Sequence, residues 1–527
     1  MKNILTAILK ENKVLTDRRF MENIKKQHII VFAATILWGL AAHGYMFFNK
    51  FSWHDDLSAM FGVGTTYPSG RWFLGILGEC MQNLFGNVSV PWFNGLLSLL
   101  LLAAGNVLLV ELFRLKQNSS CILLGGLMVV FPSWVSTYAY MFTAPYYAMA
   151  VFLAVLGIYL VWIDKVMWRG MITGAVCICL SLGIYQAYLP LAVTTLLIAF
   201  LSNVIENPER SFWGHFVKGF FGVLTVISGL IFYFVANDAI ITIKHISLTS
   251  YKNINQMGHT NLKMMMNGIV SAWKDFFVPT DNMYMSSVRG AYYVAIFLTV
   301  AFLIWHMVDC WKKNRVTLFF LTGGALCFPV GVNLLYLMGD ISGYHGIMLY
   351  AKVMVFILPL ALAEKVQIDM VKIKKYSMLC LSLLLVYVGI FYTHFANVCY
   401  LQAEFQQKEA ISWMNTLVTR IQSEEGYSRN LPIAWLNGEG QGHEVPAATT
   451  TLLNMPDVGM KFAPYGASFS NWKTAMFYWC GFSHEEIAET SEIESMQEVQ
   501  DMPSYPDAGS VRIINGVIVV KFMPKSS

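Results

Sequence analysis

The chain has 527 residues, of which 56% are apolar and 13% are charged, and its mean hydropathy is +0.52. Average soluble domains are roughly 45–50% apolar and about 25% charged, so this composition excludes an ordinary soluble protein and indicates a membrane protein. The net charge of +4 is unevenly divided: residues 395–527 carry 15 Asp+Glu and 8 Lys+Arg, and the preceding part is basic. A basic excess in a membrane protein reflects topology and not nucleic-acid binding.

Apolar runs long enough to cross a bilayer recur from residue 28 to residue 395. A membrane helix needs roughly 20 predominantly apolar residues. The runs predict about eleven spans, near residues 28–48, 90–113, 120–139, 142–163, 170–185, 187–204, 216–236, 291–309, 317–338, 345–363 and 376–395. The region 170–204 has a length that suits either two short spans or one long helix.

Lys and Arg are concentrated in alternate short loops, as in Lys312-Lys313-Arg315, whereas the loops between them are almost free of these residues. Such residues collect on the cytoplasmic side. The pattern predicts a multi-pass protein of the cell membrane with a cytoplasmic basic N-terminus, residues 1–27, and an external C-terminal tail. The alternation stays in phase only if 170–204 crosses twice, and a count of nine spans keeps the same topology of the ends.

The predicted fold is a polytopic α-helical membrane domain, residues 28–395, followed by an extracytoplasmic α/β domain, residues 396–527. Two further external loops are expected at 49–89 and 237–290. The tail opens with a helical pattern and contains the apolar strand candidate LPIAWL. Near its end, Asn515-Gly516 joins two alternating apolar runs, which is typical of a β-hairpin.

Two adjacent carboxylates, Asp55 and Asp56, lie in the stretch KFSWHDDLSAM, where the first apolar run ends. A carboxylate inside the bilayer costs about 2.5–3.5 kcal/mol on the insertion scale, and this pair avoids that cost by lying at the outer rim. A partly desolvated carboxylate beside a second one has a raised pKa, which suits a general base that acts on a sugar hydroxyl. The alternative is an ordinary acidic loop.

Three stretches of the chain resemble those of one family. WHDDLSAMFGVGTTYPSGRWFLGIL, SLGIYQAYLPLAVTTLLIAFL and the closing MPSYPDAGSVRIINGVIVVKF resemble segments of the bacterial Gtr (type II) membrane glucosyltransferases. That family is similar to the GT-C glycosyltransferases, which are multispan enzymes with an acidic residue in the first external loop. The resemblance implies a polyprenyl-phosphate sugar donor and no metal or other cofactor.

The resemblance also implies roles for particular residues. Asp55 or Asp56 becomes the catalytic base, and the choice between them stays open. Arg71, in SGRW, becomes a ligand of the donor phosphate. Tyr185 and Gln186 are expected to line the substrate cavity, and the alternative for them is a structural helix break.

Other candidates come from charge and position. Lys352 lies within an apolar run, where a charge indicates a functional site unless it reaches the interface. The residues expected at the donor phosphate are thus Arg71, Lys352 and Arg289, although Arg289 also suits an interfacial anchor. Further substrate contacts are expected from His54, Tyr344 and His345, although a turn explains the last two equally well.

The predicted function is a hexosyltransferase that transfers a sugar from a polyprenyl-phosphate donor to a cell-surface polysaccharide or glycolipid, with inversion at C1. Glucose as the sugar follows from the family resemblance alone. The expected partners are therefore the lipid-linked donor, the glycan acceptor and the bilayer, and no nucleic acid. The alternative is a lipid-linked sugar flippase, a transporter or a polysaccharide polymerase, because these proteins also have many spans and few motifs.

Overall fold

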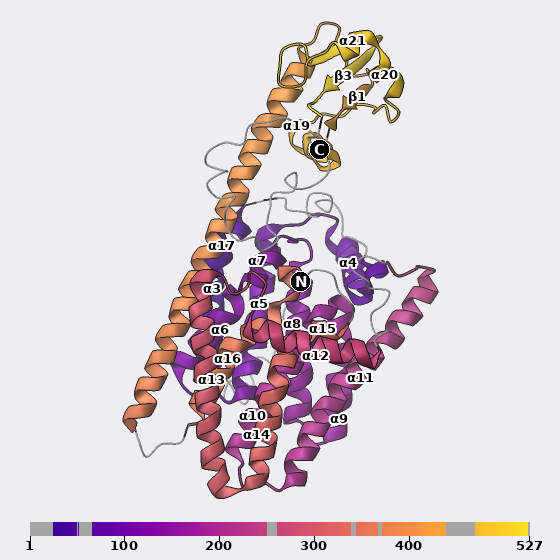
Figure 1. Ribbon diagram of the computed structural model, residues 1–527. Helices are drawn as coiled ribbons and strands as arrows, with labels where there is room; N and C mark the ends of the chain where they lie inside the picture. Colours follow the sequence, from indigo (N-terminus) through magenta and orange to yellow (C-terminus); the bar gives the residue numbers. More distant parts are fainter. Residues whose placement is uncertain are drawn as a thin grey trace, which may run out of the picture. The chain divides into compact units, whose positions relative to one another are not determined.

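The computed structural model describes residues 25–49, 51, 66–249, 261–338, 344–366, 371–438 and 469–524 (Figure 1). The predicted residues His54, Asp55 and Asp56 lie outside these ranges. The chain divides into two compact units. The helical unit comprises Met1–Phe48, Val63–Gly86 and Val90–Ala396, and the tail unit comprises Asn397–Ser527 with two short earlier segments.

The described residues of the helical unit form mainly α-helices, with several short 3-10 helices. The α-helices are α3 (Lys26–Phe48), α4 (Trp72–Phe85), α5 (Pro91–Phe113), α6 (Asn118–Val130), α7 (Pro132–Tyr138), α8 (Ala144–Ile163), α9 (Met167–Ile184), α10 (Leu189–Glu206), α11 (Phe212–Lys244), α12 (Leu262–Phe277), α13 (Ser286–Lys313), α14 (Arg315–Val332), α15 (Leu335–Met338), α16 (Met354–Glu364) and α17 (Val371–Gln422). The 3-10 helices that matter below are η3 (Tyr67–Ser69), η4 (Gln186–Tyr188), η6 (Gly346–Met348) and η7 (Tyr350–Val353).

Nine of the described helices are long and apolar enough to cross a membrane, or ten if α6 and α7 form one span bent by 43°. The eleven predicted spans are therefore not confirmed. The run 120–139 breaks before Pro132, because proline lacks the N–H that continues a helix. The run 345–363 forms η6, η7 and the 11-residue α16, which spans only about 16 Å. The region 170–204 forms two helices, α9 and α10, with η4 between them.

Burial divides the helices into inner and outer ones. α16 has the sequence MVFILPLALAE and is buried along nearly its whole length, as expected of a helix that is apolar on all sides. α11 and α13 instead expose large apolar side chains, among them Phe220, Ile231 and Phe297. Such exposed apolar faces suit contact with lipid, because water would not solvate them favourably.

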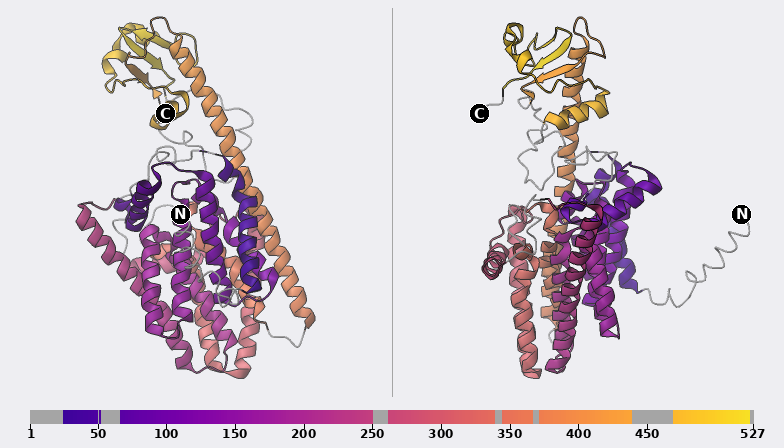
Figure 2. Two further views of the ribbon diagram at one scale, coloured as in Figure 1. Left: turned by 180° about the vertical axis from the view of Figure 1, so that it is seen from behind. Right: turned by 90° about the vertical axis from the view of Figure 1, so that its right-hand side faces the viewer.

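Most helices of this unit run alongside one another, whereas α12 runs across them in Figure 1 and is seen nearly end-on in the right view of Figure 2. α12 is amphipathic: Met264, Met265 and Met266 are exposed, whereas Asp275 and Phe276 are buried. This surface helix therefore places the carboxylate of Asp275 in the interior of the helical unit.

The tail unit contains a mixed three-stranded sheet in the order β1-β3-β2, with β1 (Ile433–Leu436), β2 (Val511–Ile514) and β3 (Val517–Lys521). β1 and β3 are parallel, and β2 and β3 form an antiparallel hairpin. Asn515 and Gly516 have φ values of 50° and 77°, as a type I′ turn requires, so the predicted hairpin is confirmed.

Helices pack against this sheet to give the tail unit its own core. Its shorter helices are α19 (Phe469–Cys480), α20 (Ser491–Ser495) and α21 (Gln497–Gln500). Trp413 and Leu417, on the last part of α17, are buried with Trp472, Tyr505 and Phe522. The run 376–395 and the helical pattern after it are thus one continuous helix.

Candidate functional site

Gly70 holds the chain in a tight turn between η3 and α4. Its φ is +69°, and a Cβ atom there would lie 2.7 Å from Tyr233 Oη and 2.9 Å from Gln186 Nε2. Gln186 Nε2 donates hydrogen bonds to Ser69 O at 2.8 Å and to Tyr233 Oη at 2.9 Å. Tyr233 Oη donates in turn to Gly70 O at 3.1 Å. Because no side chain fits there, glycine is required for the turn that presents Arg71.

Arg71, the next residue, lies against tyrosine rings. Its Nη1 donates to Tyr147 Oη at 3.2 Å, and its guanidinium carbon lies 4.6 Å from the centre of the Tyr185 ring. Its Nε is buried and has no hydrogen-bond partner among the described residues. Trp72 then packs on Gly183 of α9, where a Cβ atom would lie 2.7 Å from the indole. The structure therefore brings together SGRW and SLGIYQ, two segments separated by more than a hundred residues.

A tyrosine cluster, formed by Tyr147, Tyr185, Tyr188 and Tyr350, extends from Arg71 toward η7. The ring centres of Tyr147 and Tyr185 are 4.8 Å apart, those of Tyr185 and Tyr188 are 5.4 Å apart, and those of Tyr188 and Tyr350 are 6.2 Å apart. Tyr350 Oη donates to Met128 O at 2.7 Å. Such stacked and edge-to-face rings give a rigid wall, because their quadrupoles favour these geometries.

Lys352, two residues after Tyr350, is the centre of a buried ion cluster. Its Nζ lies 2.6 Å from Asp275 Oδ2 and also forms an ion pair with Asp281. The side chains of Lys352, Asp275 and Asp281 are only 4%, 6% and 17% exposed. Three charges held inside a helical membrane unit are costly, so their pairing points to a functional site.

Further hydrogen bonds fix both carboxylates. Asp275 Oδ1 accepts from Thr280 N at 3.2 Å and from Thr280 Oγ1 at 3.1 Å. Asp281 Oδ1 accepts from Met283 N at 2.8 Å. Tyr284 Oη donates to the backbone oxygen of Lys352 at 2.6 Å, which anchors η7 to the segment that carries Asp281. The cluster is therefore held by the backbone on both sides.

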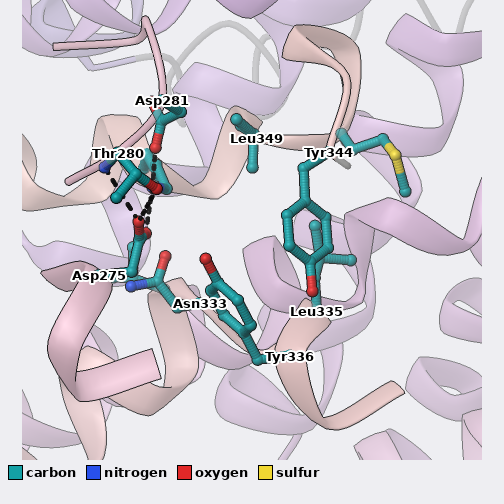
Figure 3. Close-up of a pocket in the computed structure, with 11 residues that line it drawn as sticks. Asp275, Thr280, Asp281, Asn333, Leu335, Tyr336, Tyr344 and Leu349 are labelled. Carbon is teal, nitrogen blue, oxygen red and sulfur yellow. Dashed lines mark hydrogen bonds and ion pairs between the residues drawn. The ribbon is translucent and has the colours of Figure 1, made fainter. Parts of the chain in front are cut away.

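These charged groups line a cavity of about 250 Å³. Its other lining residues include Asn333, Leu335, Tyr336, Tyr344, Met348 and Leu349. Figure 3 shows Asp275, Thr280 and Asp281 grouped at one side of the cavity, with the ring of Tyr344 across from them.

The structure distributes the predicted site residues over two centres. Arg71, Tyr185 and Gln186 meet at the first centre, whereas Lys352 and Tyr344 line the cavity. His345 is exposed at the start of η6, and Arg289 is exposed in the first turn of α13; neither lines the cavity. No described carboxylate pairs with Arg71, whereas Lys352 is paired with two.

The sequence analysis missed Asp275, Asp281, Asn333 and Tyr336. Asp275 falls in WKDFF, at the end of an amphipathic segment, where a lone carboxylate resembles a solvated surface charge. The available signal was the apolar pair Phe276-Phe277 directly after it, since two phenylalanines there indicate that this turn of the helix is partly buried. Asp281, in PTDN, resembles an ordinary turn residue.

Within the described ranges, no group of three or more His, Cys, Asp or Glu side chains could hold a metal ion. Asp275 and Asp281, the two carboxylates in the wall of the cavity, share the Lys352 ammonium. The described residues therefore offer a ligand two kinds of centre. At one centre the Arg71 cation lies among tyrosine rings, and at the other Lys352 bridges two carboxylates.

The many apolar helices, together with buried charged centres, define the class: a multi-pass membrane protein with charged groups inside its helical unit. The family model described as glucosyl transferase GtrII matches residues 44–360, more than half of the chain and including both centres. The protein belongs to this family and is a membrane glycosyltransferase of the glucosyltransferase type. The match confirms the resemblance noted from the sequence. Comparison with curated proteins and with solved structures found no match.

Proposed function

We propose that the protein transfers glucose from a polyprenyl-phosphate donor to a cell-surface polysaccharide or glycolipid, on the outer face of the membrane and with inversion at C1. The observation that carries the proposal is the setting of Arg71. A guanidinium is fixed by rings and by the Gly70 turn, and no described carboxylate neutralises it. This arrangement suits an anionic group, and the phosphate of a lipid-linked sugar is such a group.

Arg71 acts on the leaving phosphate. A guanidinium recognises phosphate through parallel N–H donors, and contact with Tyr147 and Tyr185 leaves some of its donors available. When the bond from C1 to the phosphate oxygen breaks, negative charge grows on the phosphate. A cation already held in place stabilises that charge more in the transition state than in the ground state.

The general base is proposed to be Asp55 or Asp56, in the external loop predicted at 49–89, which also contains Arg71. Its carboxylate takes the proton from an acceptor hydroxyl, and the hydroxyl oxygen forms a bond with C1 of the sugar. The bond from C1 to phosphate breaks, and polyprenyl phosphate leaves with the electron pair. Attack from the face opposite the leaving group inverts the configuration at C1.

The other residues predicted at the site differ in how far their contacts support a role. Tyr185 and Gln186 shape the donor site through their contacts with Arg71 and Ser69. His54, Tyr344 and His345 stay predictions as sugar contacts, and Arg289 stays a prediction as a phosphate ligand. A phosphate role for Lys352 also stays a prediction, although its two ion pairs favour a positioning role.

The proposed topology places residues 1–27 in the cytoplasm, the membrane domain at 28–395 and the α/β domain at 396–527 outside the cell membrane. It is supported by the alternation of Lys and Arg along the chain. Single cysteines introduced into the N-terminus and the tail, and labelled with a membrane-impermeant reagent in intact cells, test it. Labelling of the tail only after cell lysis would place Asp55 and Asp56 on the wrong face for this reaction.

Turnover by the purified protein tests the reaction itself. The protein, in lipid nanodiscs, is given polyprenyl-phosphate glucose and other polyprenyl-phosphate sugars with a bacterial surface glycan, and release of polyprenyl phosphate is measured. Release that depends on both glucose donor and glycan is expected. Movement of the donor across the membrane of proteoliposomes, without release of polyprenyl phosphate, would instead favour a flippase.

A further inference from the structure

Apart from the predicted contacts of Tyr344 and Lys352, the reaction proposed above makes no use of the cavity beside Lys352, although three charged side chains meet there. Two carboxylates and one ammonium leave it with a net charge of −1. No other Lys or Arg of the described residues lines it. A phosphate would therefore meet repulsion at this cavity, and an added cation would have to displace the ammonium that already bridges the carboxylates.

One buried acceptor in the cavity wall lacks a partner. Asn333 is 4% exposed, and its Nδ2 donates to Ala272 O at 2.9 Å, which fixes the orientation of the amide. Its Oδ1 is buried and accepts no hydrogen bond from any described residue. A buried acceptor without a partner costs free energy, so a ligand that donates a hydrogen bond to this oxygen would remove that cost.

The charged groups next to Asn333 add further hydrogen-bond donors and acceptors to the cavity wall. An ammonium has three N–H donors, and Lys352 directs two interactions to Asp275 and Asp281. Each carboxylate oxygen has lone pairs beyond those used by its described partners. The cavity thus alternates acceptors with a donor over a short distance, and vicinal hydroxyls, which both donate and accept, match that alternation.

Size and shape narrow the ligand further. The cavity of about 250 Å³ lies below the range of about 300–1,000 Å³ that is typical of ligand pockets, so it suits one sugar ring and not a lipid or an oligosaccharide. The rings of Tyr336 and Tyr344 meet edge to face with centres 4.9 Å apart, and Leu335 and Leu349 complete an apolar wall. A hexopyranose likewise combines apolar and polar surfaces, because its faces are apolar and its rim carries hydroxyls.

We propose that this cavity binds one hexopyranose unit, whose hydroxyls bond to Asp275, Asp281, Asn333 and the hydroxyl of Tyr336 while a ring face lies against Tyr344. Lys352 is then a positioning residue, because it holds the two carboxylates in place. The proposal rests on the proposed function only for the choice of glucose as the hexose. The unit comes from the donor or from the acceptor glycan, and both sources present the same chemistry.

Binding of methyl β-glucopyranoside to the full-length protein in lipid nanodiscs, followed by saturation-transfer difference NMR, tests the proposal. Asp281→Asn leaves Lys352 paired with Asp275 and is close to isosteric, and Tyr336→Phe removes only a hydroxyl. Each is expected to weaken binding at least tenfold. Tyr293→Phe, at an exposed tyrosine of α13, is the matched control and should bind like the parent. Thermal melting of each variant shows whether it is folded.

The outcomes separate this proposal from the proposed function. Arg71→Gln should bind methyl β-glucopyranoside like the parent even if it loses turnover, because the probe has no phosphate. Displacement of the probe by polyprenyl-phosphate glucose, but not by polyprenyl phosphate, assigns the cavity to the donor sugar; persistence of the probe assigns it to the acceptor. No saturable binding to the parent, or equal affinity in the parent, Asp281→Asn and Tyr336→Phe, overturns the proposal and leaves the cavity to water.

Discussion

Arg71 and Lys352 are two cations of the helical unit whose surroundings are opposite. Arg71 lies among tyrosine rings without a described carboxylate partner, whereas Lys352 lies between Asp275 and Asp281. The guanidinium is weakly hydrated and packs on ring faces, so it tolerates this setting. The ammonium is strongly hydrated and needs nearby counter-charges when it is buried. Similar charges thus produce one centre that is proposed to bind an anion and another that is proposed to bind hydroxyls.

The comparison teaches that the neighbours of a buried charge, as well as its residue type, decide which ligands the site suits. From the sequence, Arg71 and Lys352 looked alike and received the same role. In the structure the charge of Arg71 is not paired with any described carboxylate, whereas the charge of Lys352 is outweighed by the two carboxylates beside it. The predictions below test this division, beginning with the reaction that the Arg71 centre is proposed to serve.

Loss of the general base should have the largest effect. Asp55→Asn and Asp56→Asn each remove a proton acceptor while nearly keeping shape, and general base catalysis contributes about 10²- to 10⁴-fold. One of the two variants is expected to lose at least about a hundredfold in kcat. Turnover with polyprenyl-phosphate glucose measures it, and donor binding should persist. Near-parental kcat in both would remove the base from this loop.

The first effect of replacing Lys352 should be a loss of folding stability, ahead of any change in the kinetics of the reaction. Lys352→Met leaves two buried carboxylates without their cation, and breaking a buried ion pair in this way costs about 3–5 kcal/mol. The variant with Asp275→Asn and Asp281→Asn added has no net charge there and should recover most of the lost stability. Thermal melting in detergent compares them. Equal melting of the single and triple variants would show that the ion pairs do not hold the cluster.

Arg71→Gln should leave folding intact but weaken the reaction. A hydrogen bond to a charged group contributes about 1.5–3 kcal/mol, so kcat/KM should fall roughly 10- to 100-fold. The matched control is Arg169→Gln, which loses only an exposed pair with Asp164. An exposed pair contributes about 0.2–1 kcal/mol and lies away from the site. If both variants lose activity equally, Arg71 has no special role.

The Gly70 turn should have the smallest effect of the four. Alanine there must adopt a φ of +69°, which costs about 1–2 kcal/mol, and its Cβ would push against Tyr233 and Gln186. The displaced Arg71 should raise KM for the donor by up to about tenfold, with a modest loss of melting temperature. Gly290→Ala, where a Cβ atom meets nothing within 4 Å, is the control. Equal KM values for the two variants would contradict the proposed role of the turn.

Local patterns predicted much of the secondary structure but few of the contacts. Hydropathy located the membrane-length helices, and Asn515-Gly516 located the hairpin, because these signals depend on neighbours in sequence. The break at Pro132 and the short helices of 345–363 were missed, since an apolar run has the same hydropathy whether or not it is one helix. The joining of SGRW to SLGIYQ depends on tertiary contacts that no local pattern encodes.

The same limit applies to the buried ion cluster. Lys352 stood out because it interrupts an apolar run, but its partners lie in segments that look like a surface helix and a turn. Asp275 is buried only because α12 runs across the helices that meet it. Asn333 and Tyr336 follow the end of α14, where the sequence reads as a continuing apolar run. Only the fold reveals that these groups share one cavity.

The lysine-bridged pair also has a consequence for the order of biosynthesis. Asp281 and Lys352 are separated by 71 residues. At synthesis rates of about 5–20 residues per second, the ribosome needs about 4–14 s to add the lysine after the aspartate. During that interval the carboxylates have no cation and favour water over the apolar interior. We therefore expect the interior around α12 to close only after η7 has been made, and a chain that stops earlier to keep two carboxylates without their cation.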